Sequence, residues 1–299
     1  MEQKGILLES GTNELEIVEF EIANNKFGIN VIKVKEIIQP IPVTFIPHAH
    51  PYVEGIIQLR GEVLPVVDML KVLGIPNASY NAQQKYIVAE FNKQKVVFHV
   101  DNVTQIHRIS WKDIERPSDM YQGGASQVIG VIKRSEHMIL LLDFERIMVE
   151  INPDSGINVE AVKKLGNRQR SEKKIVIAED SPLLRKLLYD TMHEAGYVNL
   201  EFFENGKDAY DYLESLTVNK NISEHVQLVV TDIEMPQMDG HHLTKKIKSH
   251  PDLQVIPVII FSSLITDDLR HKGEEVGAEE QISKPEITKL ILKMDELIL

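Results

Sequence analysis

The fold of the C-terminal half is decided by the stretch Leu228-Val229-Val230-Thr231-Asp232-Ile233-Glu234-Met235-Pro236-Gln237-Met238-Asp239-Gly240. It opens with a short apolar run, which is typical of a strand buried on both faces of a parallel sheet. The acidic residue Asp232 stands at the end of that run, and a helical pattern begins near Gly240. The stretch therefore predicts a strand, a loop that carries a carboxylate, and a helix.

The same strand-then-helix pattern occurs on both sides of this stretch. Four further short apolar runs predict strands at Ile175–Ala178, Leu200–Phe203, Val258–Phe261 and Gln281–Ser283. Helical periodicity follows each strand at Leu183–Met192, Gly206–Leu216, Gly240–Ser249, Asp267–Val276 and Glu286–Leu297. Alternation of this kind predicts a doubly wound parallel α/β sheet.

Polar side chains of the kinds that bind metal ions and phosphoryl groups stand at the ends of these predicted strands. Glu179 and Asp180 follow the first strand, Asp232 the third, Ser262 the fourth and Lys284 the fifth. Because the carboxyl ends of parallel strands meet at one edge of the sheet, we expect these side chains to converge. Three carboxylates can share a small site when a hard cation offsets their repulsion, and oxygen ligands favour Mg²⁺. Asp232 would then be a nucleophile that takes up a phosphoryl group, with Ser262 and Lys284 holding its oxygens.

These motifs resemble those of response-regulator receiver domains over residues 173–299. The resemblance implies a flavodoxin-like fold with strand order 2-1-3-4-5, and transfer of a phosphoryl group from a histidine kinase to Asp232. It implies a Mg²⁺ site formed by Asp180, Asp232 and the backbone carbonyl of Glu234, with Glu179 acting mostly through water. The residues that carry it are Glu179-Asp180, Thr231–Gly240, Phe261-Ser262-Ser263 and Lys284-Pro285.

Two further expectations come from this resemblance. Family members have a cis peptide bond at the position of Lys284-Pro285. They usually have Tyr or Phe three residues before the lysine, where this chain has Gln281. An aromatic switch is therefore not expected here, and we expect output through the loop after the fourth strand or through the linker.

The N-terminal half has the pattern of a β-rich domain. Period-two alternation and turn residues separate short runs, and such spacing predicts an antiparallel barrel or sandwich. The predicted strands are Leu15–Ile22, Phe27–Val31, Gly55–Arg60, Val63–Asp68, Gln84–Phe91, Lys95–Val100, Val128–Lys133 and Met138–Leu142. Minor helices are predicted at Ile32–Ile38 and Met69–Leu73. Residues 152–172 are mostly polar and aperiodic, which predicts a linker with one brief helix at Val159–Lys164.

Residues 14–151 resemble the CheW family of chemotaxis coupling domains. The segments that carry this resemblance are Phe27-Gly28-Ile29, Val34–Ile38 and Pro51–Asp68, where Gly61 can adopt a positive φ in the Arg60-Gly61-Glu62 turn. The resemblance implies a pair of SH3-like barrels that bind the chemotaxis histidine kinase and methyl-accepting chemoreceptors. It also implies a coupling role for Arg60. A CheW-like domain followed by a receiver is the architecture of the CheV family, which the whole chain resembles.

Composition excludes several alternatives. The 299 residues contain no cysteine, so disulfides and thiolate metal sites are impossible. No signal peptide and no apolar run of about 20 residues is apparent, which favours a cytoplasmic protein without membrane insertion. The net charge of −12 falls mainly in residues 173–299, with 14 Lys and Arg against 23 Asp and Glu. Neither half is basic, so nucleic acid is not an expected partner. We expect His241 and His242 to be solvated.

The expected function is a coupling protein that links chemoreceptors to the histidine kinase at receptor arrays, under control of Asp232 phosphorylation and suited to adaptation. Enzymatic turnover beyond its own phosphorylation and dephosphorylation is not expected. The first alternative is a phosphate sink that drains phosphoryl groups from the kinase. A transcriptional regulator would need a basic DNA-binding domain. A metal-dependent hydrolase would need a substrate pocket.

Overall fold

The computed structural model describes residues 13–75, 79–115, 127–135, 137–153, 156–157, 159–163, 165–166, 168–218 and 221–299. The chain divides into two compact units. The N-terminal unit is built mainly from Glu16–Ile109 and Asp113–Ser155, and the C-terminal unit mainly from Gly156–Leu299. We describe each unit by itself.

The C-terminal unit contains a five-stranded sheet in which every pair of neighbouring strands is parallel. Its order, β13-β12-β14-β15-β16, is 2-1-3-4-5 in the numbering of the unit, as predicted. The strands are β12 (Ser171–Ala178), β13 (Tyr197–Phe203), β14 (Leu228–Thr231), β15 (Val258–Ser262) and β16 (Glu280–Ser283). The helices are α3 (Val159–Lys163), α4 (Pro182–Glu194), α5 (Gly206–Leu216), α6 (Ile222–His225), α7 (Gly240–Ser249), α8 (Asp267–Glu275) and α9 (Ile287–Ile298).

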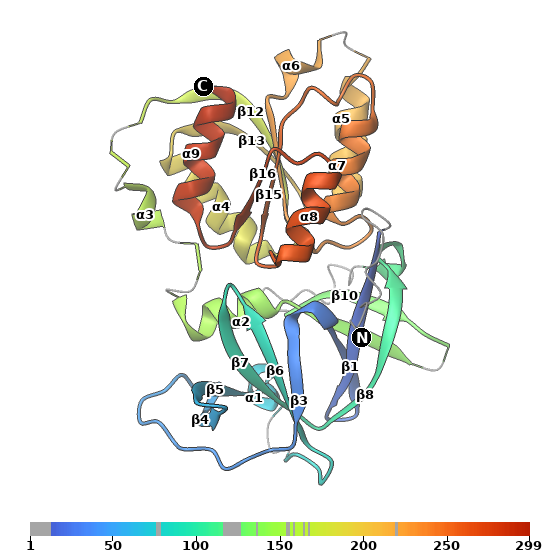
Figure 1. Cartoon of the computed structure of the whole chain (residues 1–299), viewed down its shortest axis with the longest axis vertical. Helices are drawn as coiled ribbons and strands as arrows, with labels where there is room; N and C mark the ends of the chain where they lie inside the picture. The colour runs from blue at the N-terminus through green and yellow to red at the C-terminus, as the bar shows by residue number, and fades with distance from the viewer. Residues whose placement is uncertain are drawn as a thin grey trace, which may run out of the picture. The chain divides into compact units, whose positions relative to one another are not determined.

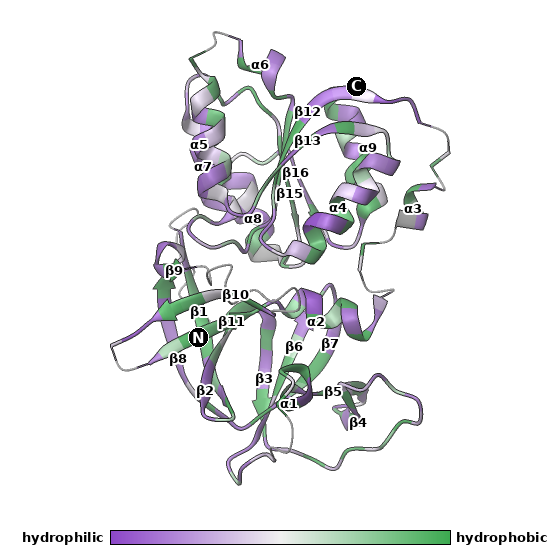
Figure 2. Cartoon of the chain, turned by 180° about the vertical axis from the view of Figure 1, so that it is seen from behind, coloured by the Kyte–Doolittle hydropathy of each residue, from purple (hydrophilic) through white to green (hydrophobic). Residues whose placement is uncertain are grey.

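Helices cover both faces of this sheet (Figure 1). Ile175 and Ile177 of β12 pack in the same core as α4 and α9, whereas Val176 and Ala178 pack with α5 and α7. Successive strand residues point to opposite faces, so an apolar run fills both cores at once. The helices α4 and α9 carry both apolar and polar residues, as helices with one buried face do (Figure 2). The predicted doubly wound α/β fold is confirmed.

The N-terminal unit is built from two sheets, with strand orders β8-β1-β2-β11-β10-β9 and β3-β6-β7-β5-β4. Most neighbours are antiparallel, but β11 pairs with β2 and β5 pairs with β7 in parallel. The strands are β1 (Glu14–Ile22), β2 (Asn25–Asn30), β3 (Val34–Ile38), β4 (Val53–Leu59), β5 (Glu62–Asp68), β6 (Lys85–Phe91), β7 (Gln94–Val100), β8 (Asn102–Ser110), β9 (Ile114–Glu115), β10 (Val128–Lys133) and β11 (Met138–Leu142). Its α-helices are α1 (Met69–Val72) and α2 (Phe144–Ile151).

The predicted all-β class of this half is confirmed, with local differences. The helix predicted at Ile32–Ile38 is wrong, because only Val31–Lys33 form a single 3-10 turn before β3 pairs with β6. The strands β8 and β9 and the helix α2 were not predicted. Asp143 begins α2 by accepting a hydrogen bond from the backbone N–H of Arg146 at 2.9 Å, an N-cap that was not predicted.

Candidate functional site

The predicted site residues of the C-terminal unit lie where its parallel strands end. Glu179 and Asp180 follow β12, Asp232 follows β14, Ser262 ends β15 and Lys284 follows β16. The backbone of Asp232 is tied to the neighbouring strand, because its N–H donates to the carbonyl of Ala178 at 2.9 Å. The topology thus brings residues that are up to about 100 positions apart in the chain to one edge of the sheet.

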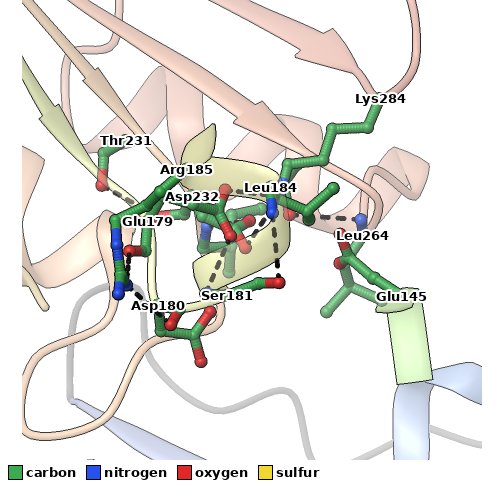
Figure 3. A network of polar contacts seen from close by, with 12 residues as sticks. Glu145, Glu179, Asp180, Ser181, Leu184, Arg185, Thr231, Asp232, Leu264 and Lys284 are labelled. Atoms are coloured by element: carbon green, nitrogen blue, oxygen red, sulfur yellow. Dashed lines mark hydrogen bonds and ion pairs between the residues drawn. The ribbon is translucent and has the colours of Figure 1, made fainter. Parts of the chain in front are cut away.

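Three carboxylates form the acidic part of this site. One oxygen each of Glu179, Asp180 and Asp232 lies within 4.8 Å of the others. Figure 3 shows these carboxylates grouped between the loops that follow β12 and β14. Glu179 and Asp232 are 1% and 3% exposed, so little water screens the repulsion between them.

Lys284 supplies positive charge to this cluster. Its Nζ lies 2.8 Å from a carboxylate oxygen of Glu179 and 3.1 Å from one of Asp232, and its exposed fraction is 2%. Figure 3 shows the lysine side chain extending from the end of β16 to both acids. A buried carboxylate pair is tolerable when a buried ammonium is hydrogen-bonded to both members.

Backbone contacts hold the two acidic loops in place. The guanidinium of Arg185 donates to the carbonyl oxygens of Glu179 and Asp180, at 2.9 and 2.8 Å. The carboxylate of Asp232 accepts the N–H of Ile233 at 2.6 Å. At Gly240 a Cβ would lie 1.9 Å from the carbonyl oxygen of Asp232, so only glycine fits there. Roles for Arg185 and Gly240 were not predicted from the sequence, although Gly240 lies within the Thr231–Gly240 motif.

The rest of the predicted site consists of Ser262, the Lys284-Pro285 peptide bond and the backbone carbonyl of Glu234. Ser262 is fully buried, and its Oγ accepts the N–H of Leu264 at 3.2 Å. The Lys284-Pro285 peptide bond is cis, as expected. The role of the Glu234 carbonyl as a metal ligand stays a prediction. Three carboxylate oxygens around one point are a donor set that a hard divalent cation such as Mg²⁺ prefers.

Gln281 and His241 have surroundings that the sequence did not indicate. The side-chain amide of Gln281 is buried and donates to the carbonyl of Arg270 in α8 at 2.6 Å. Gly273 makes room for it, since a Cβ there would lie 2.2 Å from the Gln281 side chain. The expectation that His241 is solvated is wrong, because it is 5% exposed. Burial lowers the pKa of His241 to about 4, with the charge of Lys272 as a further cause.

The N-terminal unit places Arg60 in the turn between β4 and β5. Arg60 and Gly61 have φ of +50° and +89°, which is the turn expected from the sequence. The Arg60 side chain is 77% exposed and lies 2.9 Å from a carboxylate oxygen of Glu36 in β3. This ion pair links the β4–β5 turn to β3, so it connects the two ends of the five-stranded sheet.

Comparison with known proteins identifies two domain families in the chain. Residues 16–152 match the CheW-like domain, and residues 175–295 match the response regulator receiver domain. In the described residues, no helix is long and apolar enough to cross a bilayer.

Some relatives match nearly the whole chain, and others match about half of it. The chemotaxis protein CheV3 of Helicobacter pylori is 30% identical over 96% of this chain and 95% of its own length. The chemotaxis protein CheW of Thermotoga maritima is 32% identical and covers 50% of this chain and 98% of itself.

Two solved structures match one half each. The scaffolding protein TtCheW from Thermoanaerobacter tengcongensis has 30% identity and a TM-score of 0.40, over 43% of this chain and 83% of that one. The chemotaxis protein CheY4 of Vibrio cholerae has 22% identity and a TM-score of 0.36, over 43% of this chain and 100% of that one.

Proposed function

The chain belongs to the CheV family of chemotaxis coupling proteins, and on this premise we propose that phosphorylation of Asp232 controls how it couples chemoreceptors to their histidine kinase. The observation that carries the proposal is the buried grouping of Glu179 and Asp232 with Lys284. A carboxylate next to a fixed ammonium and further acids is suited to accepting a phosphoryl group.

The proposed reaction is transfer from a phosphohistidine of the kinase. An oxygen of the Asp232 carboxylate bonds to phosphorus while the bond from phosphorus to the histidine nitrogen breaks. The Nζ of Lys284 pairs with a phosphoryl oxygen, and the hydroxyl of Ser262 donates to another. Glu179, Asp180, Asp232 and the Glu234 carbonyl would hold Mg²⁺, which when bound neutralises negative charge on the carboxylates and the phosphoryl group.

Arg60 is proposed as part of the coupling surface of the CheW-like domain. Its guanidinium is largely exposed and is held by Glu36, so a partner carboxylate can approach it without desolvating a buried charge. The proposed partners are the chemotaxis kinase and chemoreceptors, with nucleic acid excluded by the acidic charge of −12. We place the protein in the cytoplasm at receptor arrays, acting without multiple-turnover catalysis.

Phosphotransfer is tested by incubating the protein with kinase that carries ³²P on its histidine, in the presence of Mg²⁺. The wild type should take up label, and Asp232→Asn, which removes the nucleophilic carboxylate while preserving its shape, should take up none. Asp239→Asn is the matched control, because Asp239 lies seven residues further on and begins α7 by accepting the His242 N–H at 2.8 Å. Label on Asp232→Asn equal to that of the wild type would overturn the site assignment.

The control of coupling is tested separately in an array reconstituted from receptors, kinase and this protein. Beryllofluoride, which mimics a phosphoryl group, should change kinase activity with the wild type and not with Asp232→Asn. If phosphoryl uptake occurs but beryllofluoride changes neither receptor binding nor kinase activity, the protein acts as a phosphate sink.

A further inference from the structure

The segment before β12 packs against the receiver domain although its composition predicts a free linker. We call the described residues among 156–170 the strap. Ile157 and Val162 of the strap are 5% and 1% exposed, and both belong to the apolar core that contains α4 and α9. Ala161 and Leu165 pack against the same core. Figure 1 shows α3 on the side of the sheet where α4 and α9 lie.

A polar anchor holds the C-terminal part of the strap. The Nε of Arg168 donates to the carbonyl of Ala195, just after α4, at 2.8 Å. Its guanidinium also pairs with the carboxylate of Asp295 in α9. The hydroxyl of Tyr197 donates to the same carboxylate at 2.6 Å, which fixes its position. Arg168 thus links the end of α4 to α9, the same two helices whose core contains the apolar residues of the strap.

The backbone of the receiver domain at Gly196 also packs closely against the strap. Gly196 has a φ of +92°, and a Cβ there would lie 2.6 Å from the carbonyl oxygen of Gln169. The N–H of Ser171 then donates to the Gly196 carbonyl at 2.8 Å, where the strap passes into β12. These contacts fix the path of the strap along the receiver domain. A helix of only five residues, such as α3, is not stable by itself in water, so α3 depends on them.

We infer that docking of the strap on α4 and α9 limits the reach of the receiver domain from the CheW-like domain, because it shortens the free connection between them. When it is docked, only residues 152–155 separate it from α2, which ends at Ile151. Undocking would lengthen this tether to residues 152–170. The maximum span of this connection would then grow from about 14 Å to about 65 Å, at about 3.4 Å per residue.

The docked state can be tested by limited trypsin digestion of the full chain. Lys163, Arg168 and Arg170 are potential cleavage sites within the strap. Asp295→Ala leaves these sites intact and removes the partner of Arg168, so cleavage in the strap should accelerate about tenfold. Glu296→Ala is the matched control on the same helix, since Glu296 is exposed and its carboxylate pairs with Lys293 at 2.8 Å. Equal cleavage rates for Asp295→Ala and the wild type would overturn the inference.

Because Asp295 also binds Tyr197, a second test leaves that hydrogen bond intact. The chain has no cysteine, so Glu160→Cys and Leu292→Cys introduce the only two sites for spin labels, on α3 and α9. The wild-type background should give one narrow distance distribution, and added Arg168→Ala should broaden it. Added Arg170→Ala, which changes an exposed arginine of the strap, should not. A distribution that Arg168→Ala leaves narrow would contradict the role of Arg168 in docking the strap.

The effect on reach is measured by small-angle X-ray scattering of the unlabelled full chain. Arg168→Ala should raise the radius of gyration relative to Arg170→Ala. Release of the strap, seen by spin labels, with an unchanged radius of gyration would overturn its role in limiting reach.

Discussion

At the scale of single residues, Lys284 is the cation that makes the buried acids tolerable. Its Nζ contacts both Glu179 and Asp232, and all three side chains are almost fully buried. Lys284→Met should therefore lower the free energy of unfolding in the absence of divalent metal by about 3–5 kcal/mol, because two buried carboxylates lose their ion-pair partner. Chemical denaturation in EDTA measures this.

Added Mg²⁺ should stabilise Lys284→Met more than it stabilises the wild type, since the metal would then supply the positive charge that Lys284 provides in the wild type. Lys289→Met is the control, because Lys289 is an exposed lysine on the following helix, α9. A Lys284→Met protein as stable as the control in EDTA would show that Lys284 does not offset the charge of these acids.

The positions of these site residues could be predicted because parallel topology alone brings strand ends together. Asp232 and Lys284 needed only the strand pattern to be placed at one edge of the sheet. Arg185 could not be found, since its role depends on the direction of its side chain toward two backbone carbonyls. The prediction for His241 was wrong for a similar reason. His241 lies in a polar segment, but the side of the helix that carries it faces the core.

At the scale of elements, Gln281 joins β16 to α8. Its amide donates to the carbonyl of Arg270, and Gly273 leaves room for the side chain. Gln281→Ala should lower the protection of α8 amides from hydrogen exchange, because a hydrogen bond and packing contacts are lost, by about 1–2 kcal/mol in local opening free energy.

Hydrogen exchange followed by mass spectrometry resolves this effect on α8. Glu274→Ala, which changes an exposed side chain of α8, serves as the control and should have little influence. Unchanged protection of α8 in Gln281→Ala would contradict a role for Gln281 in holding the helix.

Helices and strands were predicted well where the apolar residues followed one clear periodicity. The helices α5 and α7 have the predicted bounds, because each has an N-cap side chain and an apolar stripe. The error at Ile32–Ile38 arose where apolar residues permit both a helical and a strand period. There, pairing of β3 with β6 decides the outcome, and such pairing between distant segments is not visible in a local window.

At the scale of the whole molecule, the CheW-like domain depends on a buried acid that the sequence did not reveal. Glu19 is fully buried in β1, and its carboxylate binds Lys26 at 2.5 Å, Thr104 at 2.7 Å and His107 at 2.6 Å. Burial by itself raises the pKa of Glu19. Hydrogen bonds from these residues and from His137 outweigh that effect and lower it to about 2.

Because the folded pKa of Glu19 lies below its usual value of 4.5, the ionised carboxylate stabilises the domain above about pH 4.5. That stabilisation, about 3 kcal/mol, is lost as the pH falls from about 4.5 toward about 2. Glu19→Gln should therefore be less stable than the wild type at pH 7 and should lose less stability on acidification. Denaturant unfolding between pH 7 and 3 measures the difference, with Glu16→Gln in the same strand as control. Parallel pH curves for Glu19→Gln and the wild type would refute the assignment.

The two domains should carry different steps of the function. Arg60 lies in the CheW-like domain and Asp232 in the receiver domain, so substitutions at the two positions should impair recruitment and phosphorylation control, respectively. In a reconstituted array, Arg60→Ala should weaken recruitment of the kinase about tenfold while Asp232 still accepts phosphoryl groups. Asp232→Asn should recruit the kinase normally but make its activity insensitive to beryllofluoride. Arg134→Ala is the control for Arg60, since it removes the same charge from another loop of the CheW-like domain. If Arg60→Ala and Arg134→Ala recruit the kinase equally well, the coupling surface does not include Arg60.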